Sequence, residues 1–215
     1  MRIGILGSGI VGRVLAAAFA NEGHQVGLGT RDTSKEDLVK FKDDNPAVTL
    51  DSFEKTSAAA DIIVLAVKGD IVLEVIDQSG KENISGKVVI DATNPIAAKP
   101  PVNGVLSFFT GPDNSLMEQV QAHVPDSKIV KAFNSVGNAF MYKPDFGGVK
   151  PTMFICGNDD GAKKTVTEIL DAFGWETEDM GKVEAARAIE PLCILWCIPG
   201  FLNNHWSHAF KLLKK

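Results

Sequence analysis

The sequence holds few of the residues that mark several common classes of protein. Only 3 of its 215 residues are cysteine, an odd number at spacings that match no disulfide framework, so a reducing compartment is the simplest setting. Its 22 lysine and arginine residues are outnumbered by 27 aspartate and glutamate residues, which leaves a net charge of −5. An acidic chain without a long basic run is a poor binder of nucleic acid or anionic membranes. We therefore expect neither a disulfide-stapled domain nor a nucleic-acid partner.

Long hydrophobic runs are also missing. The longest nearly apolar stretch, from Pro191 to Leu202, is shorter than the roughly 18 residues that a membrane span requires. Met1 and Arg2 lead directly into an apolar strand, with no secretory signal before it. We expect a soluble cytoplasmic protein with no membrane partner.

What the sequence does contain is an alternation of short apolar runs and helical periodicity. The clearest run, Asp61 to Val67, is rich in β-branched residues and unbroken, which is typical of a parallel strand covered on both faces. Strands separated by helices predict an α/β fold, a Rossmann-like, doubly wound and mostly parallel sheet. The expected strands are 2–6, 24–29, 47–50, 61–67, 87–91, 128–133, 153–156 and 175–180. The expected helices are 10–21, 34–43, 70–79, 116–123 and 160–173, with a further short one capped by Asp51 or Ser52.

The last part of the chain reads as an apolar helical tail. We expect residues 1–180 to form a nucleotide-binding domain and 181–215 to form this tail, which is too short to be an independent domain. Prolines at 191 and 199 should interrupt its helix. The tail carries Cys193, Cys197, His205 and His208, but they lie among large apolar residues, so we interpret them as packing residues and expect no metal site.

A glycine-rich loop joins the first expected strand to the first expected helix. Gly7-Ser8-Gly9-Ile10-Val11-Gly12 has the G-x-G-x-x-G pattern, in the strand-to-helix context that the dinucleotide fingerprint requires. The first glycine allows the tight turn, the second lets a pyrophosphate approach the backbone, and the third lets helix and strand pack closely. The free N–H groups at the helix start then bind the diphosphate.

The residues after the second expected strand indicate which dinucleotide binds. NAD sites usually carry Asp or Glu there, whereas this chain has Thr30 and Arg31, with Lys35 four residues further. An arginine can hold two oxygens of a 2′-phosphate and the threonine hydroxyl can donate a further hydrogen bond, so the pattern favours NADP. Asp32 is the competing candidate, because a shift in register by two would place it at the diagnostic position.

Besides the glycine loop, several short motifs follow one another along the chain. They are Gly29-Thr30-Arg31 with Lys35, Ala66-Val67-Lys68, Asp91-Ala92-Thr93-Asn94-Pro95, Val130-Lys131-Ala132-Phe133-Asn134-Ser135, and Glu184-Ala185-Ala186-Arg187 with Glu190-Pro191-Leu192. Over nearly the whole chain, the sequence resembles the deazaflavin-dependent NADP reductase family (coenzyme F420: NADP oxidoreductases) and the cytosolic domain of STEAP metalloreductases. Archaeal members typically carry a His where this chain has Asn134, so it looks closer to the bacterial and STEAP-like branch.

The resemblance implies an enzyme that binds NADP(H) along the carboxyl edge of the sheet, with a flavin or deazaflavin as co-substrate. It implies that Ala66, Val67 and Lys68 pass near the diphosphate and the nicotinamide ribose. It further places Thr93, Asn94, Pro95 and Asn134 near the nicotinamide. A homodimer, with the apolar tail at or near its interface, is implied as well. The expected cofactor-binding residues are thus Gly7, Ser8, Gly9, Ile10, Val11, Gly12, Thr30, Arg31, Lys35, Ala66, Val67, Lys68, Thr93, Asn94, Pro95 and Asn134.

No catalytic acid can be assigned from the sequence. The loops after the expected strands offer Thr93, Asn94 and Asn134, none of them a good proton donor, while Lys68 and Lys131 remain candidates. A flavin-type acceptor takes its proton from water, so this scarcity favours a flavin-like or deazaflavin acceptor over a carbonyl. Two alternatives stay open. One is a small imine or hydroxyacid reductase, a type that normally adds a long helical domain, and the other is a non-catalytic NADPH sensor.

Overall fold

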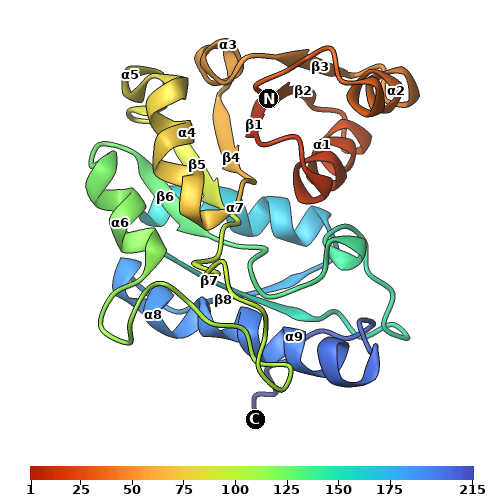
Figure 1. The fold of residues 1–215 in the computed structure, drawn as a ribbon, viewed down its shortest axis with the longest axis vertical. Helices are drawn as coiled ribbons and strands as arrows, with labels where there is room; N and C mark the ends of the chain where they lie inside the picture. The colour runs from red at the N-terminus through yellow and green to blue at the C-terminus, as the bar shows by residue number, and fades with distance from the viewer.

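One eight-stranded sheet runs through the molecule in the computed structural model, which describes residues 1–215 (Figure 1). Its strands lie in the order β3-β2-β1-β4-β5-β6-β7-β8. Every neighbouring pair is parallel except β6 and β7, which are antiparallel. The predicted α/β fold with a mostly parallel sheet is therefore confirmed. The strands are β1 (Arg2–Leu6), β2 (Gln25–Gly29), β3 (Val48–Asp51), β4 (Ile62–Leu65), β5 (Val88–Asp91), β6 (Lys128–Lys131), β7 (Thr152–Gly157) and β8 (Glu176–Asp179).

Helices cover both faces of this sheet (Figure 1). One apolar core packs α1, α2 and α7 against one face, and a second packs α3 to α6 and α8 against the other. The helices are α1 (Ile10–Asn21), α2 (Glu36–Asp44), α3 (Phe53–Ala59), α4 (Val72–Ser79), α5 (Lys81–Ile84), α6 (Leu116–His123), α7 (Asp160–Ala172), α8 (Ala186–Ile189) and α9 (Pro191–Asn203). Three short 3-10 turns are η1 (Gly69–Ile71), η2 (Asn138–Phe140) and η3 (Val183–Ala185).

Strand β4 shows why the central strands are apolar without alternation. Ile62 and Val64 face the first core, while Ile63 and Leu65 face the second. Both sides of the strand are covered, so a polar residue on either side would lose its contact with water.

The order of the strands reverses at β1, which lies between β2 and β4. The chain therefore leaves the carboxyl ends of β1 and β4 toward opposite sides, and a crevice forms at this edge of the sheet. In doubly wound folds, ligands bind at this switch point. The glycine loop follows β1 directly and lies at this edge.

Some local predictions were wrong. Ser34 does not cap α2, because its backbone N–H and hydroxyl both bind Asp32 and the cap position falls at Lys35. Pro199 does not interrupt the tail, since α9 continues through it to Asn203. Residues 204–215 form no helix and instead follow the sheet edge, where the backbone N–H of Thr152 donates to the carbonyl of Phe210.

The tail also contains a longer helical run than its sequence suggested. From Val183 to Asn203 it is long and apolar enough, by length and composition, to cross a membrane, and 33% of its most apolar window is buried. Pro191 occupies the first turn of α9, where a missing N–H costs little, so the proline does not separate α9 from α8. The run packs beside the 96–109 loop at the bottom of Figure 1, where Gly104 touches Leu202.

Candidate functional site

The glycine loop after β1 has the geometry that its predicted role demands. Gly7 has a φ of +126°, and a Cβ there would lie 2.4 Å from the carbonyl oxygen of Ala66. A Cβ on Gly12 would lie 1.8 Å from the carbonyl oxygen of Gly7, so only glycine lets α1 start this close to β1. A Cβ on Gly9 would meet nothing within 4 Å, which means that the loop is open on this side to a ligand.

The start of α1 is suited to an anion. Gly9 is its N-cap and offers no side-chain oxygen to the first N–H groups of the helix. Ile10 and Gly9 are exposed, so these N–H groups lie at the surface of the crevice. Unsatisfied N–H groups at a helix start attract phosphate oxygens. A diphosphate therefore fits this position without any basic side chain.

The residues after β2 form a polar and largely exposed group. The hydroxyl of Ser8 donates to that of buried Thr30 at 3.0 Å, which ties the glycine loop to the end of β2. Arg31 and Lys35 are both exposed, and neither takes part in an ion pair, whereas Arg13 pairs with Asp37. Two cations thus remain available to a ligand beyond the glycine loop.

Asp32, the competing candidate for a ribose contact, is already engaged. Its Oδ1 accepts hydrogen bonds from the hydroxyl of Ser34 at 2.6 Å and from the Ser34 backbone N–H at 2.9 Å. These bonds lower the pKa of the Asp32 carboxyl. The carboxylate is used in a local turn, so Arg31 and Lys35 are the better placed groups for recognising the ligand.

A cavity of about 300 Å³ lies where the loops after β4 and β5 meet. Its lining includes Val67, Lys68, Thr93 and Asn94. The two loops touch closely, because a Cβ on Gly69 would lie 2.1 Å from the carbonyl oxygen of Asn94. Residues predicted separately from two motifs are thereby brought to one cavity next to the glycine loop.

Asn94 and Asn134 form an amide pair beside this cavity. The Nδ2 of Asn94 donates to the backbone carbonyl of Asn134 at 2.8 Å. The Nδ2 of Asn134 donates to the carbonyl of Ile189 at 3.0 Å and to the Oδ1 of Asn94 at 3.3 Å. The Oδ1 of Asn134 is buried without a partner. Because both donors of Nδ2 are used, the orientation of the amide is fixed, and its buried oxygen is an acceptor without a donor.

Phe133 sets the direction of Asn134. It follows β6 with a φ of +63°, a left-handed conformation that is uncommon for a bulky residue. The side chain is buried, and its backbone N–H lies 3.2 Å from the sulfur of Met153. Such strain persists only where surrounding packing enforces it, and it is concentrated at functional sites.

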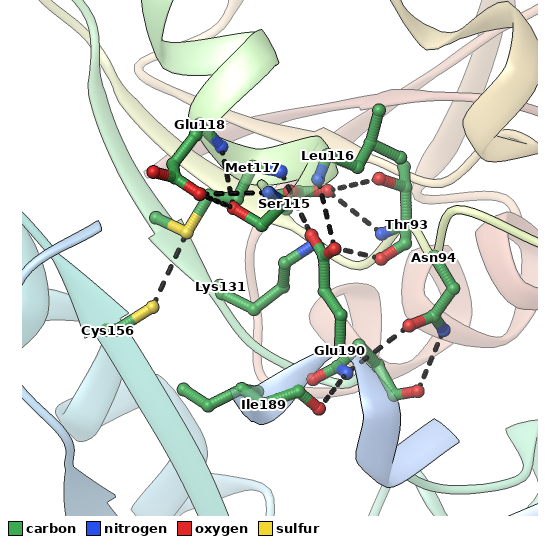
Figure 2. Close-up of polar contacts among 12 residues, drawn as sticks. Thr93, Asn94, Ser115, Leu116, Met117, Glu118, Lys131, Cys156, Ile189 and Glu190 are labelled. Atoms are coloured by element: carbon green, nitrogen blue, oxygen red, sulfur yellow. Dashed lines mark hydrogen bonds and ion pairs between the residues drawn. The ribbon is translucent and has the colours of Figure 1, made fainter. Parts of the chain in front are cut away.

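A buried ion cluster lies next to the amide pair. The Nζ of Lys131 is 2.7 Å from Asp91 Oδ2 and 2.9 Å from Glu190 Oε1, and all three side chains are 2% exposed or less. Lys131 also donates to the carbonyl of Thr93 at 2.9 Å, and its side chain converges there with that of Glu190 (Figure 2). Burial opposes the charge on Lys131, but the two carboxylates outweigh it and raise the pKa of the ammonium.

This cluster changes the interpretation of Lys131. The lysine was a candidate proton donor, but it is fully buried and held by two carboxylates, so it is not available to a substrate. The sequence analysis did not foresee Asp91 and Glu190 as its partners. Two charged residues at the ends of otherwise apolar strands were the available signal, since Asp91 and Lys131 are opposite each other in the β5–β6 register. Glu190, from the far end of the chain, gave no such signal.

Other polar and potentially reactive side chains lie in packed surroundings. The hydroxyl of Tyr142 donates to Glu22 at 2.7 Å, beside α1 rather than at the cavity. His208 stacks on Trp196 with 5.0 Å between the ring centroids, and Cys193 is buried in α9. Burial raises the pKa of Cys156 to about 12, so this thiol stays protonated.

Comparisons with known proteins identify the family of the chain. Residues 2–95 match the family described as "NADP oxidoreductase coenzyme F420-dependent". The chain is 31% identical to an F420-dependent NADP reductase from Methanocaldococcus jannaschii, over 89% of each chain. It is 27% identical to the metalloreductase STEAP3 of Rattus norvegicus, over 94% of this chain but only 39% of that protein. A solved structure from Arthrobacter sp. FB24, proposed by its name to be an F420-dependent NADP reductase, has a TM-score of 0.92 at 29% identity, with both chains fully covered.

Proposed function

Because the chain belongs to the F420-dependent NADP reductase family, we propose that it transfers a hydride between NADP(H) and a flavin-like or deazaflavin acceptor. The observation that carries this proposal is the pair of exposed cations, Arg31 and Lys35, next to an open glycine loop. A 2′-phosphate carries close to two negative charges, and this end of the crevice offers two positive ones. The Thr30 hydroxyl is buried and already hydrogen-bonded to Ser8 and Asp32.

The adenosine half of the cofactor lies toward β2 in this proposal, since residues after the second strand bind the ribose in such folds. The nicotinamide half then extends the other way from the glycine loop, over the carboxyl ends of β4 and β5. The cavity lined by Val67, Lys68, Thr93 and Asn94 is on that side. The unpartnered Oδ1 of Asn134 fits the amide donor of a nicotinamide carboxamide.

When bound, NADPH supplies the hydride from its nicotinamide ring. The chain's own residues then orient the two rings and exclude water. Asn94 and Asn134 fix each other by hydrogen bonds, and the loop after β4 closes the side of the cavity. Holding the two reactants close together in the correct orientation supplies a large part of the rate enhancement in such reactions.

The proposed class of acceptor makes little demand on acid–base groups in the site. The cavity lining holds Asn94, Thr93, whose hydroxyl donates to Asp91, and the exposed side chains of Lys68 and Asp70, while Lys131 is sequestered. Reduction of a carbonyl needs a proton delivered in the site. A flavin or deazaflavin takes hydride on its ring and exchanges its proton with water, so the site does not need to deliver a proton to it.

The experiment is to follow NADPH oxidation by the loss of nicotinamide absorbance with riboflavin, FMN, FAD and a deazaflavin, with NADH in parallel. We expect turnover with one of these acceptors and a clear preference for NADPH. Tight NADPH binding without any turnover contradicts the proposal and favours an NADPH sensor.

The imine reductase from Streptomyces aurantiacus shares the fold alone, at 16% identity and a TM-score of 0.66, and the present chain covers 63% of it.

We also propose that the enzyme is a cytoplasmic homodimer in which residues 181–215 complete the domain formed by 1–180. Exposed apolar side chains from α9 and from the 96–109 loop beside it support a shared face. They are Leu195, Phe201, Leu202, Val102, Val105 and Phe109. Glu190, in the same helical run, is buried against α6, which supports packing on the protein rather than insertion into a membrane. Leu195→Glu should convert the dimer to monomer in light-scattering measurements.

A further inference from the structure

The buried ion cluster carries a net negative charge. Every neighbour of its carboxylate oxygens is a donor. The Oδ1 of Asp91 accepts from the N–H and hydroxyl of Thr93, at 2.9 and 2.7 Å, and Oδ2 faces the Lys131 ammonium. The Oε2 of Glu190 accepts from the Leu116 N–H at 3.0 Å, and Oε1 accepts from the Met117 N–H at 2.9 Å. The cluster thus sets two carboxyl groups against one ammonium, which can balance only one of them.

The cluster adjoins the proposed nicotinamide site through two short connections. Lys131 donates to the carbonyl of Thr93, and the next residue is Asn94. Ile189 accepts from Asn134, and the next residue is Glu190 (Figure 2). Solvent does not reach the cluster, so its field is screened far less than that of a surface charge.

A purely structural ion pair would not need the second carboxylate. Asp91 and Lys131 already form a neutral pair across β5 and β6. Glu190 adds an unbalanced charge in a buried position, which is costly. Its compensation comes from two N–H groups at the start of α6, whose dipole supplies only about half a unit of positive charge. The uncompensated negative charge that Glu190 adds therefore acts on the ligand in the neighbouring cavity.

We propose that this buried surplus charge determines which redox form of the cofactor the site prefers. It favours the oxidised nicotinamide, which is a cation, over the neutral reduced ring, and it stabilises the positive charge that develops as a hydride leaves NADPH for the acceptor. The inference rests on the proposed function, because that function puts the nicotinamide beside Asn94 and Asn134. Glu190 is the residue whose charge makes the site prefer NADP⁺ over NADPH.

The test measures the dissociation constants of NADP⁺ and NADPH separately, by calorimetry, for the intact protein and for Glu190→Gln and Asp91→Asn. Each variant removes one unit of negative charge and nearly preserves shape. One unit charge about 10 Å from another, at an effective dielectric constant of about 20, changes an equilibrium by on the order of tenfold. We therefore expect the ratio of the NADP⁺ to the NADPH constant to rise about tenfold in both variants.

Two control variants separate this effect from others. Glu118→Gln removes a carboxylate from the same helix start, but one that pairs with Arg187 at the surface, and it should leave the ratio unchanged. Arg31→Ala should weaken both redox forms by the same factor, because it lies at the opposite end of the crevice. A purely structural role for the cluster predicts equal weakening of both forms in Glu190→Gln, and this result would overturn the proposal.

The wild-type protein provides a further criterion if the two cluster variants fail to fold. The proposal then requires that wild-type protein binds NADP⁺ at least as tightly as NADPH. A wild-type protein that binds NADPH more tightly than NADP⁺ contradicts it. Failure of the proposed function looks different, since it appears as no binding of either form or as no turnover with any acceptor.

Discussion

The two ends of the proposed cofactor crevice are built in opposite ways. At the β2 end, Thr30, Arg31 and Lys35 come from one short stretch of sequence, and the two cations are exposed. At the β5–β6 end, Asp91, Lys131 and Glu190 come from three distant parts of the chain and are buried. An exposed cation keeps its water until a ligand arrives, so it can stand alone. A buried charge must be paired in the folded protein itself.

Because of this difference, we expect mutations at the two ends of the crevice to have different effects. Changes at the exposed end should alter ligand affinity and leave the fold intact. Changes at the buried end should alter stability as well, because they leave a charge or a donor without its partner. The order of expected effects follows from this difference.

The largest effect is expected for Lys131→Met. It leaves two carboxylates buried without a counter-ion, and removal of one partner from a buried pair costs about 3–5 kcal/mol. Urea denaturation should show this loss in the free energy of unfolding. Lys150→Met, which breaks an exposed pair with Asp171, is the matched control and should change little. Equal stability of the two variants would mean that the cluster is not the buried charge network described above.

The next effect is on cofactor choice rather than stability. Arg31→Glu replaces a cation with a carboxylate next to the proposed 2′-phosphate, so NADPH affinity should fall about 100-fold while NADH affinity changes far less. Fluorescence titration of both cofactors against wild type and the variant measures this difference. Asp32→Asn tests the competing residue and should leave the preference for NADPH in place, since Asp32 is used by Ser34. Equal losses for NADPH and NADH in Arg31→Glu would contradict the assignment of the 2′-phosphate.

The same contrast explains what the sequence could and could not predict. The glycine loop and the β2 end could be predicted because their chemistry depends on adjacent residues, and the strands could be predicted from apolar runs such as that of β4. The partners of Lys131 were not readable, because Glu190 reaches the cluster through the packing of α8 on α6, which no local pattern encodes. Pro199 was misread for a similar reason, since α9 tolerates it in its last turns.

The smallest effect concerns an exposed ion pair and its dependence on pH. Arg2 bonds to Asp61 through its backbone N–H at 2.8 Å and through its guanidinium, and these bonds lower the pKa of Asp61 from 3.8 to about 2. A carboxyl whose pKa is depressed by folding stabilises the protein above its unfolded pKa and loses that contribution as pH falls through its folded pKa.

Arg2→Gln should therefore melt slightly below wild type at pH 7. The difference should shrink between pH 4 and pH 2, as followed by circular dichroism. A difference for Arg2→Gln that persists unchanged to pH 2 would show that packing of the arginine stem, rather than its charge, supports this end of the sheet.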